Sequence, residues 1–281
     1  MPAKFKASCS SSIFKQVQKC QLKAETWKIS PEGLSYQAHH RHGVAVMSEL
    51  YLSTQEFKKF ECKEEFLMKI NPKFFSSIWS CTDWSDTVVM SVDEDVTHFN
   101  LVVHNQRREC KKTQTFRLKC IPVVKKWVER KDEDYVCQLE MPSERFRDIT
   151  MGLRKISELR NDITVRMAAD KVVFESKGDK TCLKSIVTIT PKDKDYKYTS
   201  LMTVEAPFRN RIFSFPTLNV MLNDNIFLKF TEDKLLVAEY QILKAGFLRY
   251  FMAPSTEKIL YCKNKGAAPA KSEWKKHRYF E

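Results

Sequence analysis

The sequence predicts an α+β protein made of two similar halves, each with two short helices packed on antiparallel strands. Three observations support this prediction. Apolar residues recur at steps of three, four and three positions, as in an amphipathic helix, at Phe146, Ile149, Leu153 and Ile156. Runs of alternating apolar residues on both sides of short polar turns predict antiparallel hairpins. This order of helices and hairpins occurs twice, at a spacing near half of the 281 residues.

The first half is predicted to contain two helices, each opened by residues that favour a helix start. Ser10 to Ser12 precede the apolar stripe of the first helix, and Asn71-Pro72 precedes that of the second. The predicted elements, in order, are a strand at 4–7, a helix whose stripe runs over 13–20, a hairpin over 27–36, strands at 44–52 and 66–70, a helix opening at 71, a hairpin over 87–103 and a strand at 113–118.

The second half repeats this order. Ser143, after Pro142, is the expected N-cap of its main helix, and Pro216 is expected to end its second. The predicted elements are a strand at 135–139, a helix over 143–156, a hairpin over 163–176, strands at 184–190 and 198–204, a short helix over 208–215, a hairpin over 225–242 and a strand at 247–252. The predicted domains are therefore 1–118 and 135–258, joined by a charged loop at 119–134 and followed by a basic, disordered tail at 259–281.

Composition limits the function classes. The net charge of +13 favours a polyanionic partner, with nucleic acid ahead of an anionic membrane surface. No run of 18 apolar residues exists, so no membrane span is expected. Nine cysteines without a Cys-x-x-Cys pair indicate reduced, buried thiols.

Catalytic and metal chemistry have little support. Phosphate-loop, zinc-protease and serine-hydrolase motifs are absent from the sequence, so we expect no enzyme, no catalytic residue and no cofactor. The run from His39 to His42 lets at most His40 and His42 converge on a strand, and no neighbouring ligand completes a tetrahedron. We therefore expect no metal site.

Several local patterns resemble the eukaryotic-type DNA sliding clamp family, proliferating cell nuclear antigen. The resemblance covers about residues 4–258 and indicates a divergent member, viral or a paralogue. No single motif decides it, but their order and spacing together are specific. The patterns are Trp27-Lys-Ile-Ser with Gly33, Asp134-Tyr-Val-Cys137 with Met141-Pro-Ser143, and Leu236-Val-Ala-Glu-Tyr-Gln-Ile242 with Phe247-Leu-Arg-Tyr-Phe-Met-Ala-Pro254.

The resemblance implies a DNA clamp fold with two similar domains per chain and three chains per ring. The ring would surround double-stranded DNA, hold DNA polymerase and other replication and repair proteins on it, and be placed there by a clamp loader. Edge strands at 111–118 and 181–190 would pair between subunits, because open strand edges must be paired or protected. The expected location is the nucleus, or the site of viral DNA replication for a viral protein.

The same resemblance suggests which cations face DNA, although each could equally be an ordinary solvated charge. This chain departs from the family where Gln16 follows Lys15, where Ser77 and Ser80 stand in place of lysines, and where Asp148 and Met151 replace arginines. Two arginines expected on the fourth helix could compensate. The candidate DNA-binding residues are Lys15, Lys19, Arg147, Arg154, Lys155, Arg209 and Arg211.

A pocket for partner peptides is implied beside the interdomain loop. That loop is basic here, with Lys125, Lys126, Arg130 and Lys131, and Leu235 replaces a proline of the family. Peptides with a basic flank should therefore be disfavoured by like charge. Trp127 is either a pocket wall or a packing residue. The candidate pocket residues are His42, Val44, Val46, Val123, Trp127, Val128, Leu235, Phe251, Ala253 and Pro254.

Two alternatives to a homotrimeric clamp stay open on the sequence. One is a checkpoint-clamp subunit that assembles as a heterotrimer, favoured by the lost lysines and the altered pocket. The other is a monomeric basic viral processivity factor or single-strand binding module. The mass in solution separates the three.

Overall fold

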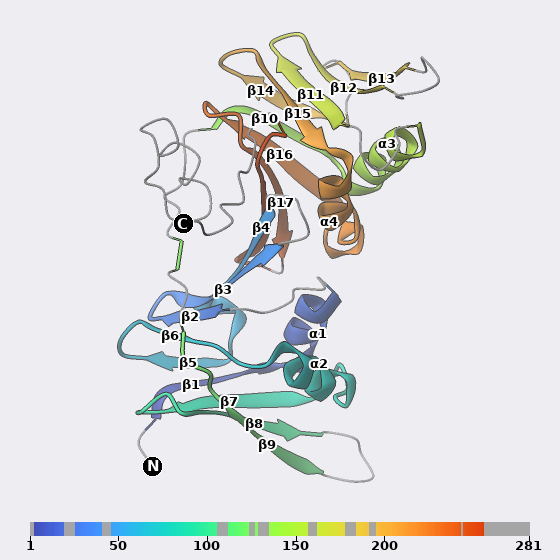
Figure 1. The fold of residues 1–281 in the computed structure, drawn as a ribbon. Coiled ribbons are helices and arrows are strands. Elements are labelled where there is room, and N and C mark those ends of the chain that lie inside the picture. The colour runs from blue at the N-terminus through green and yellow to red at the C-terminus, as the bar shows by residue number, and fades with distance from the viewer. Residues whose placement is uncertain are drawn as a thin grey trace, which may run out of the picture. The chain divides into compact units, whose positions relative to one another are not determined.

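The computed structural model describes residues 3–19, 26–40, 46–105, 112–123, 127–128, 135–156, 162–177, 184–190, 195–242 and 244–255. The chain divides into two compact units (Figure 1). The first unit comprises Met1–His39, Ser48–Trp127 and Gln241–Leu248, and the second comprises His40–Met47, Val128–Tyr240 and Arg249–Glu281.

The N-terminal half forms antiparallel sheet and two helices. One sheet has the strand order β5-β1-β7-β8-β9, and β2 pairs with both β3 and β6. The elements are β1 (Ala3–Ser10), α1 (Ser11–Lys19), β2 (Thr26–Ser30), β3 (Gly33–His40), β4 (Val46–Ser53), η1 (Thr54–Glu56), β5 (Lys59–Cys62), β6 (Phe66–Met68), α2 (Pro72–Ser80), β7 (Thr87–Asp93), β8 (His98–His104) and β9 (Thr113–Lys119).

Aromatic packing holds α1 against α2. The Phe14 ring stacks on the Trp79 ring with centroids 4.5 Å apart, and Phe75 meets Phe14 edge-on at 6.0 Å. All three side chains are buried. Such aromatic pairs each contribute about 0.5–1.5 kcal/mol beyond the area they bury. The two helices are therefore fixed to each other by their inward faces, which leaves their other faces to solvent.

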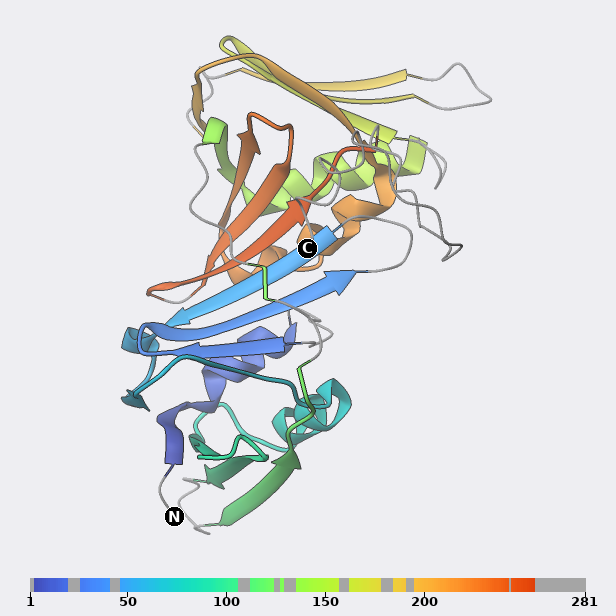
Figure 2. The same ribbon diagram turned by 60° about the vertical axis from the view of Figure 1, so that its left-hand side comes forward.

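The C-terminal half has the same kinds of element. Its strands follow the orders β14-β10-β16-β17-β18 and β13-β12-β11-β15, and α3 lies along the second sheet with α4 beside it (Figures 1 and 2). The elements are β10 (Tyr135–Pro142), α3 (Ser143–Ile156), β11 (Asp162–Ala168), β12 (Lys171–Lys177), β13 (Lys184–Ile189), β14 (Lys197–Ser200), β15 (Val204–Arg209), η2 (Asn210–Phe213), α4 (Ser214–Thr217), η3 (Val220–Leu222), β16 (Asn225–Thr231), β17 (Leu236–Ile242) and β18 (Gly246–Met252).

The predicted α+β class is confirmed. Within the described residues each half of the chain contributes nine strands and two α-helices. α3 covers the predicted 143–156, and Phe146, Ile149 and Leu153 are buried along it as the stripe requires.

Two predicted elements of the second half are wrong. The strand expected at 198–204 is two strands, because the chain bends at Leu201, whose N–H donates to Val136 O at 2.8 Å. The helix expected over 208–215 starts later. Phe208 still belongs to β15, where it pairs with Ile163, and helical structure begins at Asn210. Pro216 lies inside the four-residue α4, where a missing N–H costs nothing in the first turn.

The role expected for Ser143 also differs. Ser143 is itself the first residue of α3, and its hydroxyl donates to Asn223 O at 2.7 Å. Its N–H donates to Asp224 O. The residue therefore ties the start of α3 to the segment before β16.

The described cysteines are free thiols, and three of them are buried: Cys9, Cys120 and Cys137. Burial raises the pKa of the Cys9 thiol to about 12 and that of Cys120 to about 11. Both therefore stay protonated and unreactive at neutral pH. None of the described helices has the length and apolar character needed to cross a membrane.

Candidate nucleic-acid interface and partner pocket

The outward side of α2 carries little charge. Phe75, Ile78 and Trp79 point inward, whereas Ser77 and Ser80 are exposed. The Ser77 hydroxyl donates to Lys73 O at 2.9 Å and the Ser80 hydroxyl to Ser77 O at 2.7 Å. These protons are already used within the helix, so the two serines do not replace lysines as donors to phosphate.

The cation predicted on α1 lies beside an aromatic ring. The ammonium of Lys15 is 5.7 Å from the centre of the Trp84 ring, and its side chain is partly buried. Such a cation–π contact holds a lysine side chain in place without neutralising its charge. The side chain of Lys19, the other candidate on α1, lies outside the described residues.

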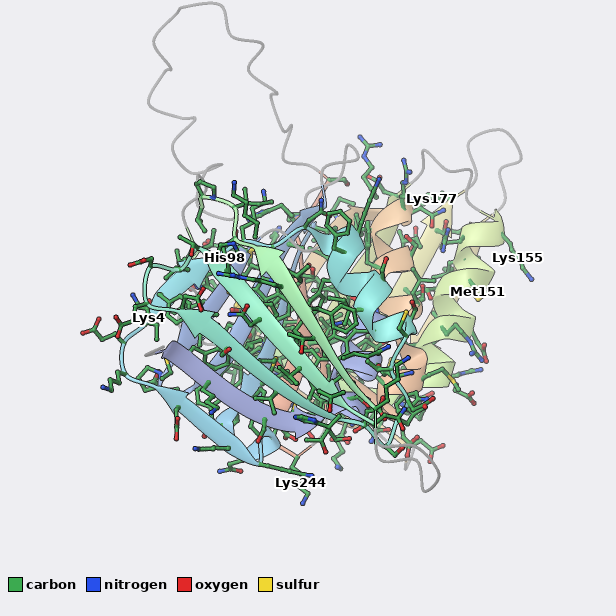
Figure 3. The ribbon with its side chains drawn as sticks, turned by 90° about the horizontal axis from the view of Figure 1, so that it is seen from below. Lys4, His98, Met151, Lys155, Lys177 and Lys244 are labelled. Atoms are coloured by element: carbon green, nitrogen blue, oxygen red, sulfur yellow. The ribbon has the colours of Figure 1, made fainter. Side chains whose placement is uncertain are left out.

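The outward side of α3 mixes charge with apolar surface. Lys155 and Met151 are exposed and project from the same side of the helix (Figure 3), and Arg154 is partly exposed. Arg147 lies 3.7 Å from carboxylate oxygens of both Glu144 and Asp148. Its charge is therefore partly balanced by its own helix, whereas Arg154, Lys155 and the exposed Arg145 in the first turn have no ion pair among the described residues.

The two arginines expected on the fourth helix are not on α4. Arg209 ends strand β15, with its Nε 3.7 Å from Asp162 Oδ1, and Arg211 lies on η2. Both are exposed. Two exposed apolar residues, Leu218 and Met221, follow α4. The candidate cations are thus spread over α1, α3, β15 and η2.

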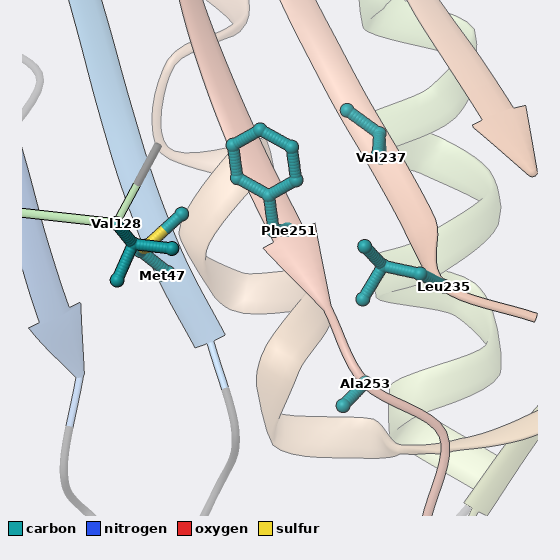
Figure 4. Close-up of a cluster of buried hydrophobic side chains, with 6 residues drawn as sticks. All are labelled: Met47, Val128, Leu235, Val237, Phe251 and Ala253. Atoms are coloured by element: carbon teal, nitrogen blue, oxygen red, sulfur yellow. The ribbon is translucent and has the colours of Figure 1, made fainter. Parts of the chain in front are cut away.

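Four predicted pocket residues meet in one buried cluster of the second unit (Figure 4). They are joined by Met47 and Val237, and Tyr135 packs against the group. The backbone around Leu235 is fixed by its N–H, which donates to the Thr231 hydroxyl at 3.1 Å. The predicted residues that meet are Val128, Leu235, Phe251 and Ala253.

The remaining pocket candidates are not in this cluster. Val46 is buried, but the next residue along β4, Met47, is the cluster member. Trp127 lies under the ammonium of Lys28, 5.8 Å from the ring centre. Pro254 is buried and Val123 partly buried, whereas His42 and Val44 fall outside the described residues.

Sequence reasoning missed an ion triad close to the cluster. Glu239 Oε1 is 3.0 Å from Lys229 Nζ, and its Oε2 accepts a 2.6 Å hydrogen bond from Arg249 Nε. The Glu239 and Lys229 side chains are only 9% and 11% exposed. The Lys229 ammonium also lies 5.0 Å from the centre of the Tyr135 ring. Alternation along the strands would have placed these three residues on one face. It would not have predicted that their charged groups pair with one another.

In each half, one sheet of the described strands ends in an edge strand whose exposed residues are partly basic. β9 exposes Arg117, 3.6 Å from an Asp93 oxygen, and β13 exposes Lys184. Lys184 and Lys177 lie 3.0 and 3.3 Å from Glu175. Burial opposes ionisation of Glu175, but hydrogen bonds from both lysines outweigh it and lower its pKa. Arg117 and Lys184 therefore each have a carboxylate partner within the chain, although Glu175 is shared by two lysines.

Comparison with known families agrees with this architecture. The model of the proliferating cell nuclear antigen N-terminal domain matches residues 2–126. The model of the C-terminal domain of the same antigen matches residues 129–255. Together the two matches cover nearly all the described residues. The chain therefore belongs to the proliferating cell nuclear antigen family of sliding clamps.

Proposed function

We propose that this chain is a subunit of a homotrimeric DNA sliding clamp that surrounds duplex DNA and keeps a polymerase and other proteins on it. The observation that carries the proposal is the pair of domain matches in tandem, over two halves that each carry two helices. The role is one of holding and docking, without catalysis. We place it in the nucleus, or at the site of viral DNA replication for a viral protein.

Contact with DNA would be electrostatic and independent of base sequence. Arg154, Lys155 and Arg211 are the cations best placed to meet phosphates, because they lie on helical segments and carry no ion pair among the described residues. Such contacts weaken steeply with salt. A ring, by contrast, stays on closed DNA in salt because it is held by topology.

A duplex with controllable ends tests the proposal without a clamp loader. The protein is allowed to thread onto a linear duplex tethered to a bead at one end, and the free end is then capped with a bulky protein. We expect capped DNA to retain the protein through a high-salt wash and to lose it after one restriction cut. Equal loss from capped and uncapped DNA would contradict a topological clamp.

The buried cluster around Leu235 is proposed as the docking pocket for partner peptides. It is an apolar cluster that includes Val128, Leu235 and Phe251, and the basic residues Lys125 and Lys126 precede Val128 in the sequence. A peptide with an apolar anchor and an acidic flank should bind more tightly than the same anchor with a basic flank. A titration by fluorescence anisotropy, with Leu235→Ala as the pocket control, measures this difference. Equal affinity for the two flanks would refute the preference.

One observation favours a second candidate, a subunit of a checkpoint-type heterotrimer. Ser77 and Ser80 use their hydroxyl protons within α2, and Arg147 is balanced within α3. A chain with so little positive charge facing DNA fits a ring in which other subunits supply the positive charge. If the chain is a subunit of such a heterotrimer, it would not assemble as a trimer on its own.

A further inference from the structure

The side chain of Lys28, on β2, contacts the interdomain loop within the first unit. Its ammonium lies 2.9 Å from Glu65 Oε2, just before β6, and 5.8 Å from the centre of the Trp127 ring. The Lys28 side chain is only 17% exposed, whereas that of Glu65 is 50% exposed. A cation–π contact is stronger where the cation is shielded from water, and an exposed ion pair contributes little. The contact between Lys28 and the ring is therefore the firmer of the two.

The interdomain loop is also fixed near its start. Ile121 pairs with Lys69 in an isolated bridge, and its N–H donates to Lys69 O at 2.7 Å. Trp127 is partly buried and is the last residue that the first unit takes from this loop. The backbone therefore holds the loop at Ile121, and the contact with Lys28 holds it at Trp127.

The residue after Trp127 belongs to the buried cluster around Leu235. Val128 is a member of that cluster and is 9% exposed. Because consecutive Cα atoms are only about 3.8 Å apart, fixing Trp127 restricts where Val128 can lie. A loop that is ordered before a partner arrives spares the partner the entropic cost of ordering it.

We propose that Lys28 is a positioning residue for partner docking. By holding the Trp127 ring, its ammonium keeps Val128 in the cluster where a peptide would bind. The inference rests on the docking role proposed above for that cluster. It assigns Trp127 to anchoring the interdomain loop and not to lining the pocket.

A direct role of Trp127 as a pocket wall is the competing explanation, and it depends differently on Lys28. If the ring itself contacted the peptide, the charge of Lys28 would matter little to peptide affinity. If the ring is an anchor, a cation is required at position 28. Arginine should then replace lysine, because a guanidinium also stacks on aromatic rings and pairs with carboxylates.

The first measurement needs no peptide and follows chymotrypsin cleavage after Trp127 by mass spectrometry. Cleavage requires the ring to leave its place, so its rate follows the fraction of chains in which the ring is released. Lys28→Met keeps an unbranched apolar side chain without the charge and should speed cleavage about 2- to 30-fold. Lys28→Arg should be cleaved at the rate of the parent.

The second measurement is the anisotropy titration with the labelled acidic-flanked peptide. Lys28→Met should raise the Kd at least about 2-fold, because apparent affinity falls with the fraction of chains whose loop is held. Lys28→Arg should restore the parent affinity. Lys59→Met is the matched control, since Lys59 forms an exposed 2.8 Å pair with Glu61 in the same unit, and it should match the parent in both measurements.

Three results would overturn the proposal. They are unchanged cleavage in Lys28→Met, parent affinity for the peptide in Lys28→Met, and losses in Lys28→Arg as large as those in Lys28→Met. A parent protein that binds no peptide would instead contradict the docking role itself, and positioning for docking with it. Binding by the parent with no effect of Lys28→Met overturns the positioning role alone, so the two failures are distinguishable. The melting temperature of each variant confirms that it is folded.

Discussion

Gly33 marks the place in the first unit where the backbone least tolerates a side chain. It follows the turn between β2 and β3 with a φ of 156°, and a Cβ built there would overlap the Leu52 carbonyl oxygen. Backbone in this region is costly for any residue with a Cβ. We predict that Gly33→Ala lowers the free energy of unfolding by about 1–3 kcal/mol, or more if β4 must shift.

Gly152 is the matched control for that substitution. It is exposed within α3, and a Cβ added there would meet nothing within 4 Å. Because glycine costs a helix about 0.5–1 kcal/mol relative to alanine, Gly152→Ala should be stabilising. Urea denaturation of the two variants therefore should give midpoint shifts of opposite sign. An unchanged or raised midpoint for Gly33→Ala would show that the turn at Gly33 is not strained by a Cβ.

Single residues also show which members of the buried cluster could be predicted from the sequence and which could not. Val128, Leu235, Phe251 and Ala253 were predicted as one pocket and do meet. Met47 was missed in favour of Val46, because a strand places neighbours on opposite faces and the sequence does not reveal which face turns to the cluster.

At the scale of elements, prediction succeeded where local chemistry decides the outcome. α2 begins where Asn71 and Pro72 predicted: the Asn71 side chain accepts from the Lys73 N–H at 3.0 Å, and Pro72 is the first helical residue. The fourth helix was misplaced because residues 204–209 pair with β11, more than 35 residues earlier. No local pattern encodes that pairing, and it overrides helix formation at Phe208 and Arg209.

The triad of Lys229, Glu239 and Arg249 joins three neighbouring strands, β16, β17 and β18. Removing the carboxylate charge would leave two cations in a largely desolvated place. We predict that Glu239→Gln lowers the free energy of unfolding by about 3 kcal/mol. Glu205→Gln is the control, because Glu205 forms an exposed 3.8 Å pair with Arg166. It should cost less than about 1 kcal/mol. A similar loss in both variants would mean that the triad is no stronger than a surface pair.

At the scale of the whole chain, the repeat was the strongest signal in the sequence. Hairpins at 87–103 and 225–242 hold the same place in the two halves, and the structure has β7–β8 and β16–β17 there. The domain boundaries at 118, 134 and 258 stay predictions. The resemblance implies ring assembly, and the open edges of β9 and β13 provide the surfaces it needs.

Those two edges are suited to pairing with each other. Phe116 and Leu118 on β9 are half-buried, as is Val187 on β13, so backbone pairing between copies would also cover apolar side chains. Arg117 and Lys184 at these edges have the carboxylate partners Asp93 and Glu175, which reduces like-charge repulsion between copies. Neither β9 nor β13 contains a proline, and the charged residues that would oppose such pairing are limited to Arg117 and Lys119 on β9 and Lys184 on β13.

Ile186, in the middle of β13, is 50% exposed and is the residue at which to break this pairing. A lysine there would place an unbalanced charge in the joint sheet, so we predict that Ile186→Lys converts a trimer of 33.0 kDa chains into single chains. Native mass spectrometry measures this directly, and a single cooperative melting transition of the monomer shows that each chain stays folded. Leu218→Lys, at a residue 56% exposed beside α4, should leave the trimer intact. Trimers that survive Ile186→Lys would exclude β13 as the contact. A parent protein that is already monomeric would contradict the homotrimer and favour either the heterotrimer subunit, which needs its other subunits to close a ring, or the monomeric processivity factor.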